Sequence, residues 1–214
     1  MTRVGLPPAT PVVFVVDDDV SVRESLELLI TSLGWRAETF AAAHEFLARP
    51  RLEEPSCLVL DVTLPDLDGL ELQKRVAGER PDMPIIFITG YGDVPMSVLA
   101  MKGGAVEFLT KPLRDDTLVE AITNAVERSR RELHHEAGMQ RLREGYATLT
   151  PREREVMALV VSGRSNKQVG DELGISEITV KAHRGKVMAK MRAGSLAGLV
   201  KMATALEPGS TESR

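Results

Sequence analysis

Short apolar runs alternate with segments of helical hydrophobic spacing along the first half of the chain. An unbroken apolar run suits a strand that is buried on both faces, whereas apolar residues three or four positions apart suit a helix with one buried side. These patterns predict strands at residues 12–16, 36–40, 57–61, 85–89 and 106–109. They predict helices at 22–33, 42–47, from 68 or 69 to 80, at 95–102, and from 115 or 116 onward. This alternation predicts an α/β fold with a doubly wound, five-stranded parallel sheet.

The first and third predicted helices have recognisable ends. Ser21 and Glu24 have the spacing of a capping box, and Gly34 is placed as a C-terminal cap. We therefore expect the first helix to begin just after Ser21. Pro81 should end the third helix, because proline cannot continue one.

The C-terminal part begins with helix signals and continues as short helices around a glycine turn. The expected capping residues are Thr150 with Pro151 and Glu153, then Ser165 with Gln168, and then Ser176. Gly174 separates a short helix from a longer one that runs to about residue 191. This pattern predicts a small all-α domain with a helix-turn-helix, which binds DNA in many proteins. A generic helical hairpin explains the pattern equally well.

The segment between these two parts is almost entirely charged or polar. Residues 129–148 are therefore expected to form a solvated linker helix. A metal site at His134 and His135 is disfavoured, because adjacent positions point to different sides of a helix. The lead before Pro11 is expected to be flexible and the tail from Pro208 disordered. The expected domains are thus 11–128 and 149–206, joined by the linker.

Length and composition restrict the class of protein. The 214 residues suit one domain of about 120 residues and a smaller second one. No apolar run reaches the roughly 18 residues of a membrane span, and no secretory signal pattern is present, so we expect a soluble, cytoplasmic protein without a membrane partner. The single cysteine, Cys57, lies in a predicted buried strand and is interpreted as a core residue.

The two parts of the chain carry opposite net charge. Residues 1–148 hold 16 basic and 24 acidic side chains, a net charge of −8, whereas residues 149–214 hold 11 and 7, a net charge of +4. A polyanion such as nucleic acid should therefore prefer the C-terminal part.

Polar residues follow four of the predicted strands at the point where each strand ends. They are Asp17 and Asp18 after the first strand, Asp61 after the third, Thr89 after the fourth and Lys111 after the fifth. The carboxyl ends of parallel strands meet at one edge of a sheet, where ligands bind in open α/β folds. Neighbouring carboxylates repel one another and need a cation, and Mg²⁺ is the ion that binds through one or two carboxylates together with phosphate oxygens. Taken singly, each residue is also explained as an ordinary loop, strand or surface position.

In combination, these residues resemble the two-component response regulators over nearly the whole chain. The matching residues are Asp17 with Asp18, Asp61 with Leu64, Pro65 and Gly69, Thr89 with Gly90, Phe108, and Lys111 with Pro112. The resemblance implies a receiver domain with strand order 2-1-3-4-5. It also implies that Asp61 is the phosphoacceptor, which attacks a phosphohistidine on a sensor histidine kinase.

The resemblance also implies the ligands of a magnesium ion. Asp18 and Asp61 would bind Mg²⁺ together with the backbone carbonyl of Thr63, and Asp17 would reach the ion through water.

Further roles implied by the resemblance concern the phosphoryl group and the switch. Lys111 and Thr89 would hold the phosphoryl group, and the peptide bond between Lys111 and Pro112 would be cis. On phosphorylation, Thr89 would move inward and Phe108 would fill the space that it leaves.

The C-terminal part resembles the LuxR-type output domain, and the whole chain resembles the NarL/FixJ subfamily of response regulators. The matching residues are Leu149, Thr150, Glu153, Glu155, Val156, Gly163, Asn166, Lys167, Leu173, Ile175, Ser176, Thr179, Val180, His183 and Lys190. This resemblance favours promoter double-stranded DNA as a partner over a generic hairpin. Val180, Val187 and Met191 should face the core. The candidate DNA-binding residues are Lys167, Ser176, Thr179, Lys181, Ala182, His183, Arg184, Gly185, Lys186 and Lys190.

These observations predict a DNA-binding transcriptional regulator that is switched by phosphorylation of Asp61, forms a homodimer when phosphorylated, and is not an enzyme. RNA polymerase is considered as a further partner. The opposite charges suggest that the receiver covers or misorients the DNA-binding surface before phosphorylation. One alternative is a Mg²⁺-dependent phosphatase of the haloacid-dehalogenase type, with Asp17 as nucleophile and Asp19 as general acid. Another is a DNA-binding dimer that is independent of phosphorylation.

Overall fold

A computed structural model describes residues 10–90 and 94–207 of the chain. It contains two compact units, and the division between them falls at His134 and His135. This point lies inside one helix, α5 (Asp115–Ala147), so the charged segment that the sequence assigned to a linker is helical as far as Ala147. The flexible lead before residue 10 and the disordered tail from Pro208 were predicted for residues that lie outside the described part.

The first unit is built on a five-stranded parallel sheet with the order β2-β1-β3-β4-β5. The strands are β1 (Val12–Val16), β2 (Arg36–Phe40), β3 (Ser56–Asp61), β4 (Ile85–Thr89) and β5 (Glu107–Thr110). The predicted α/β class and the strand order implied by the family resemblance are both confirmed.

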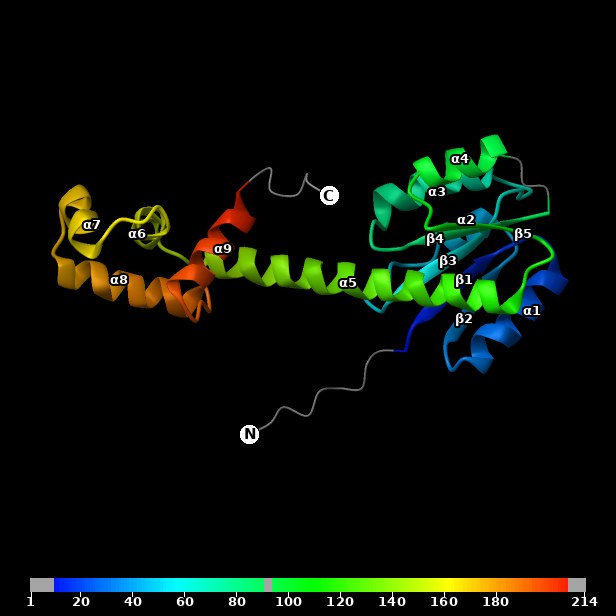
Figure 1. Cartoon of the computed structure of the whole chain (residues 1–214), viewed down its shortest axis with the longest axis horizontal. Coiled ribbons are helices and arrows are strands. Elements are labelled where there is room, and N and C mark those ends of the chain that lie inside the picture. Colours follow the sequence, from blue (N-terminus) through cyan, green and yellow to red (C-terminus); the bar gives the residue numbers. More distant parts are fainter. Residues whose placement is uncertain (1–9, 91–93, 208–214) are drawn as a thin grey trace. The chain divides into compact units, whose positions relative to one another are not determined.

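Helices cover both faces of this sheet (Figure 1). The remaining helices of the unit are α1 (Val20–Ser32), α2 (Ala43–Leu47), α3 (Gly69–Glu79) and α4 (Val94–Lys102). Phe14 of β1 packs in one core with α2, α3 and α4, whereas its neighbours Val13 and Val15 pack in the other core with α1 and α5. Successive side chains of a strand point to opposite faces, so two covered faces explain why β1 is apolar at every position.

The start of α1 differs from the prediction. The helix begins at Val20, and its N-cap is Asp19, whose carboxylate accepts a hydrogen bond from the Ser21 backbone N–H at 2.8 Å. The expected capping box of Ser21 and Glu24 is therefore wrong. Asp is as good an N-cap as Ser, and Asp19 comes first along the chain, so the helix gains residues at its start.

The second unit is all-helical and contains the predicted helix-turn-helix. Its helices after α5 are α6 (Pro151–Val161), α7 (Asn166–Leu173), α8 (Glu177–Lys190) and α9 (Leu196–Leu206). The capping boxes that open α6 and α7 are confirmed, as is the N-cap at Ser176. Gly174 joins α7 to α8 with φ +66°, a conformation that glycine adopts without strain. The sequence patterns did not predict α9.

Among the described residues, no helix is both long enough and apolar enough to cross a membrane.

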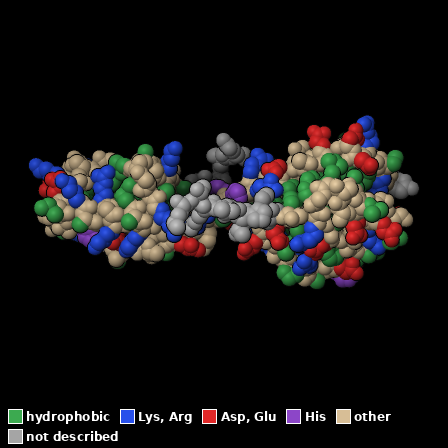
Figure 2. Space-filling model, turned by 90° about the horizontal axis from the view of Figure 1, so that it is seen from below, with side chains coloured by type: hydrophobic (Ala, Val, Ile, Leu, Met, Phe, Trp, Pro, Cys, Tyr) green, Lys and Arg blue, Asp and Glu red, His purple; other side chains and the backbone are tan. Residues whose placement is uncertain are grey.

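The face of α8 that points away from α6 and α7 is turned toward the reader in Figure 2, and Lys and Arg side chains are spread over this unit.

Candidate functional site

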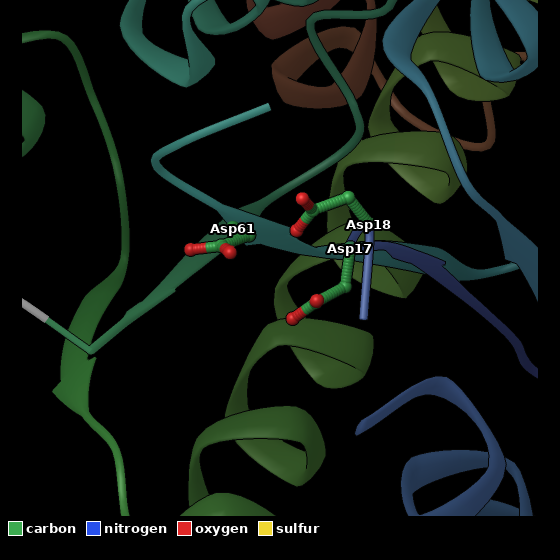
Figure 3. A group of neighbouring side chains, drawn as sticks. All are labelled: Asp17, Asp18 and Asp61. Carbon is green, nitrogen blue, oxygen red and sulfur yellow. The ribbon is translucent and has the colours of Figure 1, made fainter. Parts of the chain in front are cut away.

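Three carboxylates gather at the carboxyl edge of the sheet. Asp17 and Asp18 directly follow β1, and Asp61 ends β3, the strand paired beside it. One carboxylate oxygen from each of these three residues lies within 4.8 Å of the corresponding oxygens of the other two (Figure 3). Asp17 is fully buried and Asp61 nearly so, while Asp18 is exposed. The parallel register thus brings these residues together as the sequence predicted.

Lys111 reaches the same cluster from the end of β5. Its Nζ lies 2.7 Å from Asp17 Oδ2 and 3.3 Å from Asp61 Oδ2. Its backbone N–H also donates to the Thr89 carbonyl at 2.7 Å, which ties it to the end of β4. The peptide bond between Lys111 and Pro112 is cis, as the family resemblance implied. Burial lowers the pKa of Lys111, but the two carboxylates outweigh burial and raise the pKa, so the ammonium stays charged.

One ammonium does not balance the charge of this cluster. Burial raises the pKa of the Asp61 carboxyl, Asp17 raises it further, and Lys111 opposes both effects. With all three carboxyls ionised, the cluster and Lys111 carry a formal charge of −2. A divalent cation with oxygen ligands would neutralise that charge, and a partly exposed site leaves room for water ligands. The donor set therefore fits Mg²⁺.

The loop after Asp61 is held at both ends. At the near end, a backbone interaction with Thr63 opposes the rise in the pKa of the Asp61 carboxyl. At the far end, Gly69 donates to the Val62 carbonyl at 2.9 Å. A Cβ built on Gly69 would lie only 2.7 Å from the Asp61 carbonyl oxygen, so only glycine fits this close approach.

Asp66 anchors the middle of this loop to α2. Its carboxylate accepts the backbone N–H groups of Ala43 and His44 at 3.1 and 3.0 Å, and it contacts His44 Nδ1 at 2.9 Å. Burial opposes the charge of Asp66, but these hydrogen bonds lower its pKa to about 2. Asp66 therefore caps a helix whose own N-cap residue, Ala42, has no capping side chain. Sequence reasoning missed Asp66 and His44, because no local pattern marks a cap supplied from a distant loop.

Thr89 and Phe108 lie on adjacent strands. Thr89 ends β4 and is 2% exposed. Phe108 on β5 pairs with Phe87 in the sheet register, and their ring centroids lie 6.2 Å apart. Phe108 is half-buried and packs against the core that faces α2, α3 and α4.

The exposed face of α8 is a basic surface with small residues between the charges. Val180, Val187 and Met191 are buried, as predicted. The exposed side carries Lys181, Ala182, Gly185 and Lys186. Lys167 on α7 is also exposed. These residues form a surface that a polyanion can approach.

Other predicted DNA contacts are engaged within the unit. Lys190 Nζ lies 2.6 Å from Glu153 Oε2 and donates to the Thr148 carbonyl at 2.9 Å, so its ammonium is engaged within the unit instead of facing outward on the basic surface. The hydrogen bond from Lys190 is the main reason that the pKa of Glu153 falls to about 2.

The remaining candidates on α8 and at its N-cap make contacts within the unit or are partly buried. The Ser176 side chain accepts the Thr179 backbone N–H at 3.2 Å, and Arg184 Nη1 donates to Asn166 Oδ1 at 3.2 Å. His183 Nδ1 is buried and has no hydrogen-bond partner among the described residues. Sequence reasoning missed Ile178, which is 79% exposed; the available signal was its position one helical turn before Ala182.

Comparisons with known proteins cover both units. Residues 13–123 match the response regulator receiver domain, and residues 147–203 match the bacterial regulatory proteins of the luxR family. Nodulation protein W of Bradyrhizobium diazoefficiens is 51% identical over 195 residues, which are 91% of this chain and 86% of that protein. Transcriptional regulatory protein FixJ of the same organism is 43% identical over 192 residues, 89% of this chain and 93% of that protein. The solved structure of the response regulator StyR has a TM-score of 0.83 at 44% identity and covers 91% of this chain and 98% of that one.

Proposed function

Because this chain belongs to the two-component response regulators with a LuxR-type DNA-binding domain, we propose that phosphoryl transfer to Asp61 controls its binding to promoter DNA. The observation that supports this proposal is the position of Asp61, beside Lys111 and two further carboxylates at the sheet edge. A sensor histidine kinase is the proposed phosphodonor, and the cytoplasm is the proposed location because the DNA is there.

In the proposed reaction, an Asp61 carboxylate oxygen attacks the phosphorus of a phosphohistidine. A P–O bond forms, the P–N bond breaks, and the leaving imidazole takes up a proton. Lys111, whose Nζ lies 3.3 Å from Asp61 Oδ2, would pair with a phosphoryl oxygen, and the Thr89 hydroxyl would hydrogen-bond another. Bound Mg²⁺, held by Asp18, Asp61 and the Thr63 carbonyl, with Asp17 reached through water, would neutralise charge on the transferred group.

The phosphatase alternative requires Asp17 to be the nucleophile. The Asp17 side chain is 0% exposed and pairs with Lys111, and its Oδ1 accepts the Asp19 backbone N–H at 2.9 Å. The Asp61 side chain keeps 10% of its surface exposed. A phosphodonor therefore reaches Asp61 more easily, which supports a regulator rather than an enzyme with turnover.

Labelling with a small-molecule phosphodonor tests the acceptor. Acetyl phosphate and Mg²⁺ should label the wild-type protein, and Asp61→Asn should remove the label. Asp19→Asn, a change next to the cluster, is the matched control and should still be labelled. If Asp61→Asn kept the label and Asp17→Asn lost it, the phosphatase would replace the regulator.

A groove beside Lys111 is the proposed docking site of the kinase. It has a volume of about 330 Å³ and lies between α1 and the chain that follows β5, with Val22, Leu29 and Leu113 among its lining residues. It adjoins the acceptor and is largely apolar, as suits a helical partner. Ser25→Arg should fill this groove and slow transfer from the phosphorylated kinase, while labelling by acetyl phosphate stays unchanged. Equal slowing with both donors would exclude docking here.

Phosphorylation is proposed to produce a dimer through α4 and β5. The exposed side chains of α4 include Val94 at 76% and Leu99 at 58%, an apolar surface that a second copy could cover. The added negative charge would draw Thr89 inward, and Phe108 would follow and reshape this surface. Two DNA-binding units held together bind adjacent half-sites more tightly than one. Contact with RNA polymerase stays a prediction.

A further inference from the structure

Ile178 is the most exposed large apolar side chain among the described residues. It is the second residue of α8 and is 79% exposed, although the rest of its helix buries apolar residues on the opposite side. Neither packing nor helix propensity explains isoleucine here, because β-branched residues are poorer helix formers than the common polar ones.

Helical spacing places Ile178 at the centre of the outward face of α8. Ala182 follows it by four residues and Gly185 by seven, and both are exposed. Lys181 and Lys186 flank this line on either side. A Cβ built on Gly185 would meet nothing within 4 Å, so the face is not covered by other described parts of the unit.

The flanking lysines indicate which partner meets Ile178. An apolar side chain set between cations suits a ligand that offers phosphates on both sides of an apolar group. The major groove of DNA offers this arrangement, because the 5-methyl group of thymine is the apolar group on its base edges. In helix-turn-helix proteins, residues at the start of the second helix contact these edges.

We propose that Ile178 is a specificity-determining residue that packs against a thymine methyl group in each half-site. This inference rests on the DNA binding proposed above. Ala182 and Gly185 add little bulk next to it, so the start of α8 can approach the bases closely. Lys181 and Lys186 hold the phosphates and carry no base preference.

Replacement of thymine by uracil tests the contact, since it removes only the methyl group. Full-length phosphorylated protein is first used to select preferred duplexes from a random pool. Each thymine of the selected site is then replaced in turn, and dissociation constants are measured at one fixed salt concentration. For the wild-type protein, uracil at one position per half-site should weaken binding about fourfold, which corresponds to the loss of one buried methyl group.

The variants separate this contact from general DNA affinity. Ile178→Ala should bind the thymine duplex more weakly and show no further loss with uracil at that position. Lys181→Ala should weaken every duplex and keep the uracil penalty. Because Ile178 is exposed and alanine is the better helix former, its replacement should not lower the thermal midpoint.

Two results distinguish failure of the inference from failure of the proposed function. If the wild-type protein selects no duplex, promoter binding itself is wrong. If it selects a site but Ile178→Ala keeps the full uracil penalty, the thymine contact is wrong and DNA binding stands. Loss of self-association in Ile178→Ala without DNA would assign the residue to a protein interface and would also overturn the inference.

Discussion

Gly69→Ala should damage the acceptor site, whereas Gly78→Ala in the same helix should not. A Cβ on Gly69 would lie 2.7 Å from the Asp61 carbonyl oxygen and 3.0 Å from two backbone atoms of Val62. Ordinary contact begins at 3.4 Å, so the Asp61 carbonyl would have to move by about 0.7 Å. Backbone atoms cannot rotate away as a flexible side chain can, and this peptide joins the phosphoacceptor to its loop.

The expected size of the effect follows from this overlap. Overpacking in a well-packed site costs about 1–3 kcal/mol, so we expect Gly69→Ala to lower the free energy of unfolding by about 2 kcal/mol. A Cβ on Gly78 would meet nothing within 4 Å. Gly78→Ala should instead raise the free energy of unfolding by up to about 1 kcal/mol, because alanine is the better helix former.

Urea unfolding followed by tryptophan fluorescence measures both variants. The chain has a single tryptophan, Trp35, which packs on the core of the receiver and so reports this unit alone. Labelling by acetyl phosphate should slow in Gly69→Ala and stay at the wild-type rate in Gly78→Ala. If Gly69→Ala were as stable and as readily labelled as Gly78→Ala, the close approach would not constrain the site.

Further predictions concern the switch, the loop and the second unit. Thr89→Ala should accept phosphate but lose most of the gain in dimerisation, and sedimentation that shows wild-type dimerisation after labelling would exclude the switch. Asp66→Ala removes the cap of α2 and should weaken Mg²⁺ binding several-fold in titration calorimetry; an unchanged affinity would mean that the loop needs no anchor. The folded-state pKa of Glu153 is about 2 against an ordinary 4.5, so its contribution to stability is present above pH 4.5 and lost as pH falls toward 2. Over that pH range, hydrogen exchange should show that the difference in protection of the α6 amides between the wild type and Glu153→Gln becomes smaller. A difference that stays constant with pH would contradict the ion pair. Finally, residues 149–206 alone should bind the selected DNA without phosphorylation, and gel shifts that show no gain over the unphosphorylated full-length protein would leave dimerisation as the sole source of activation.

Local signals in the sequence determined most of the helices and strands and the meeting of the carboxylates at the sheet edge. The apolar run at Val12–Val16 can only be buried on both faces, and it formed a central strand. The capping boxes at Thr150 and Ser165 formed as predicted, because their partners lie three residues away. Parallel strands end at one edge, so the meeting of Asp17 and Asp61 also followed from the order of the elements.

Tertiary structure decided the contacts between residues that are distant in sequence. Asp66 caps α2 from 22 to 23 residues further along the chain. Lys190 pairs with Glu153, which is 37 residues away, instead of extending from the basic surface. No local sequence pattern predicts the close approach of Gly69 to the Asp61 carbonyl. Periodicity and capping act over a few residues, whereas a carboxylate or an ammonium pairs with whichever group the packed chain brings within hydrogen-bond distance. The sequence by itself therefore determined most of the elements and which edge of the sheet carries the chemistry, and only packing decided which polar groups hold that edge in place.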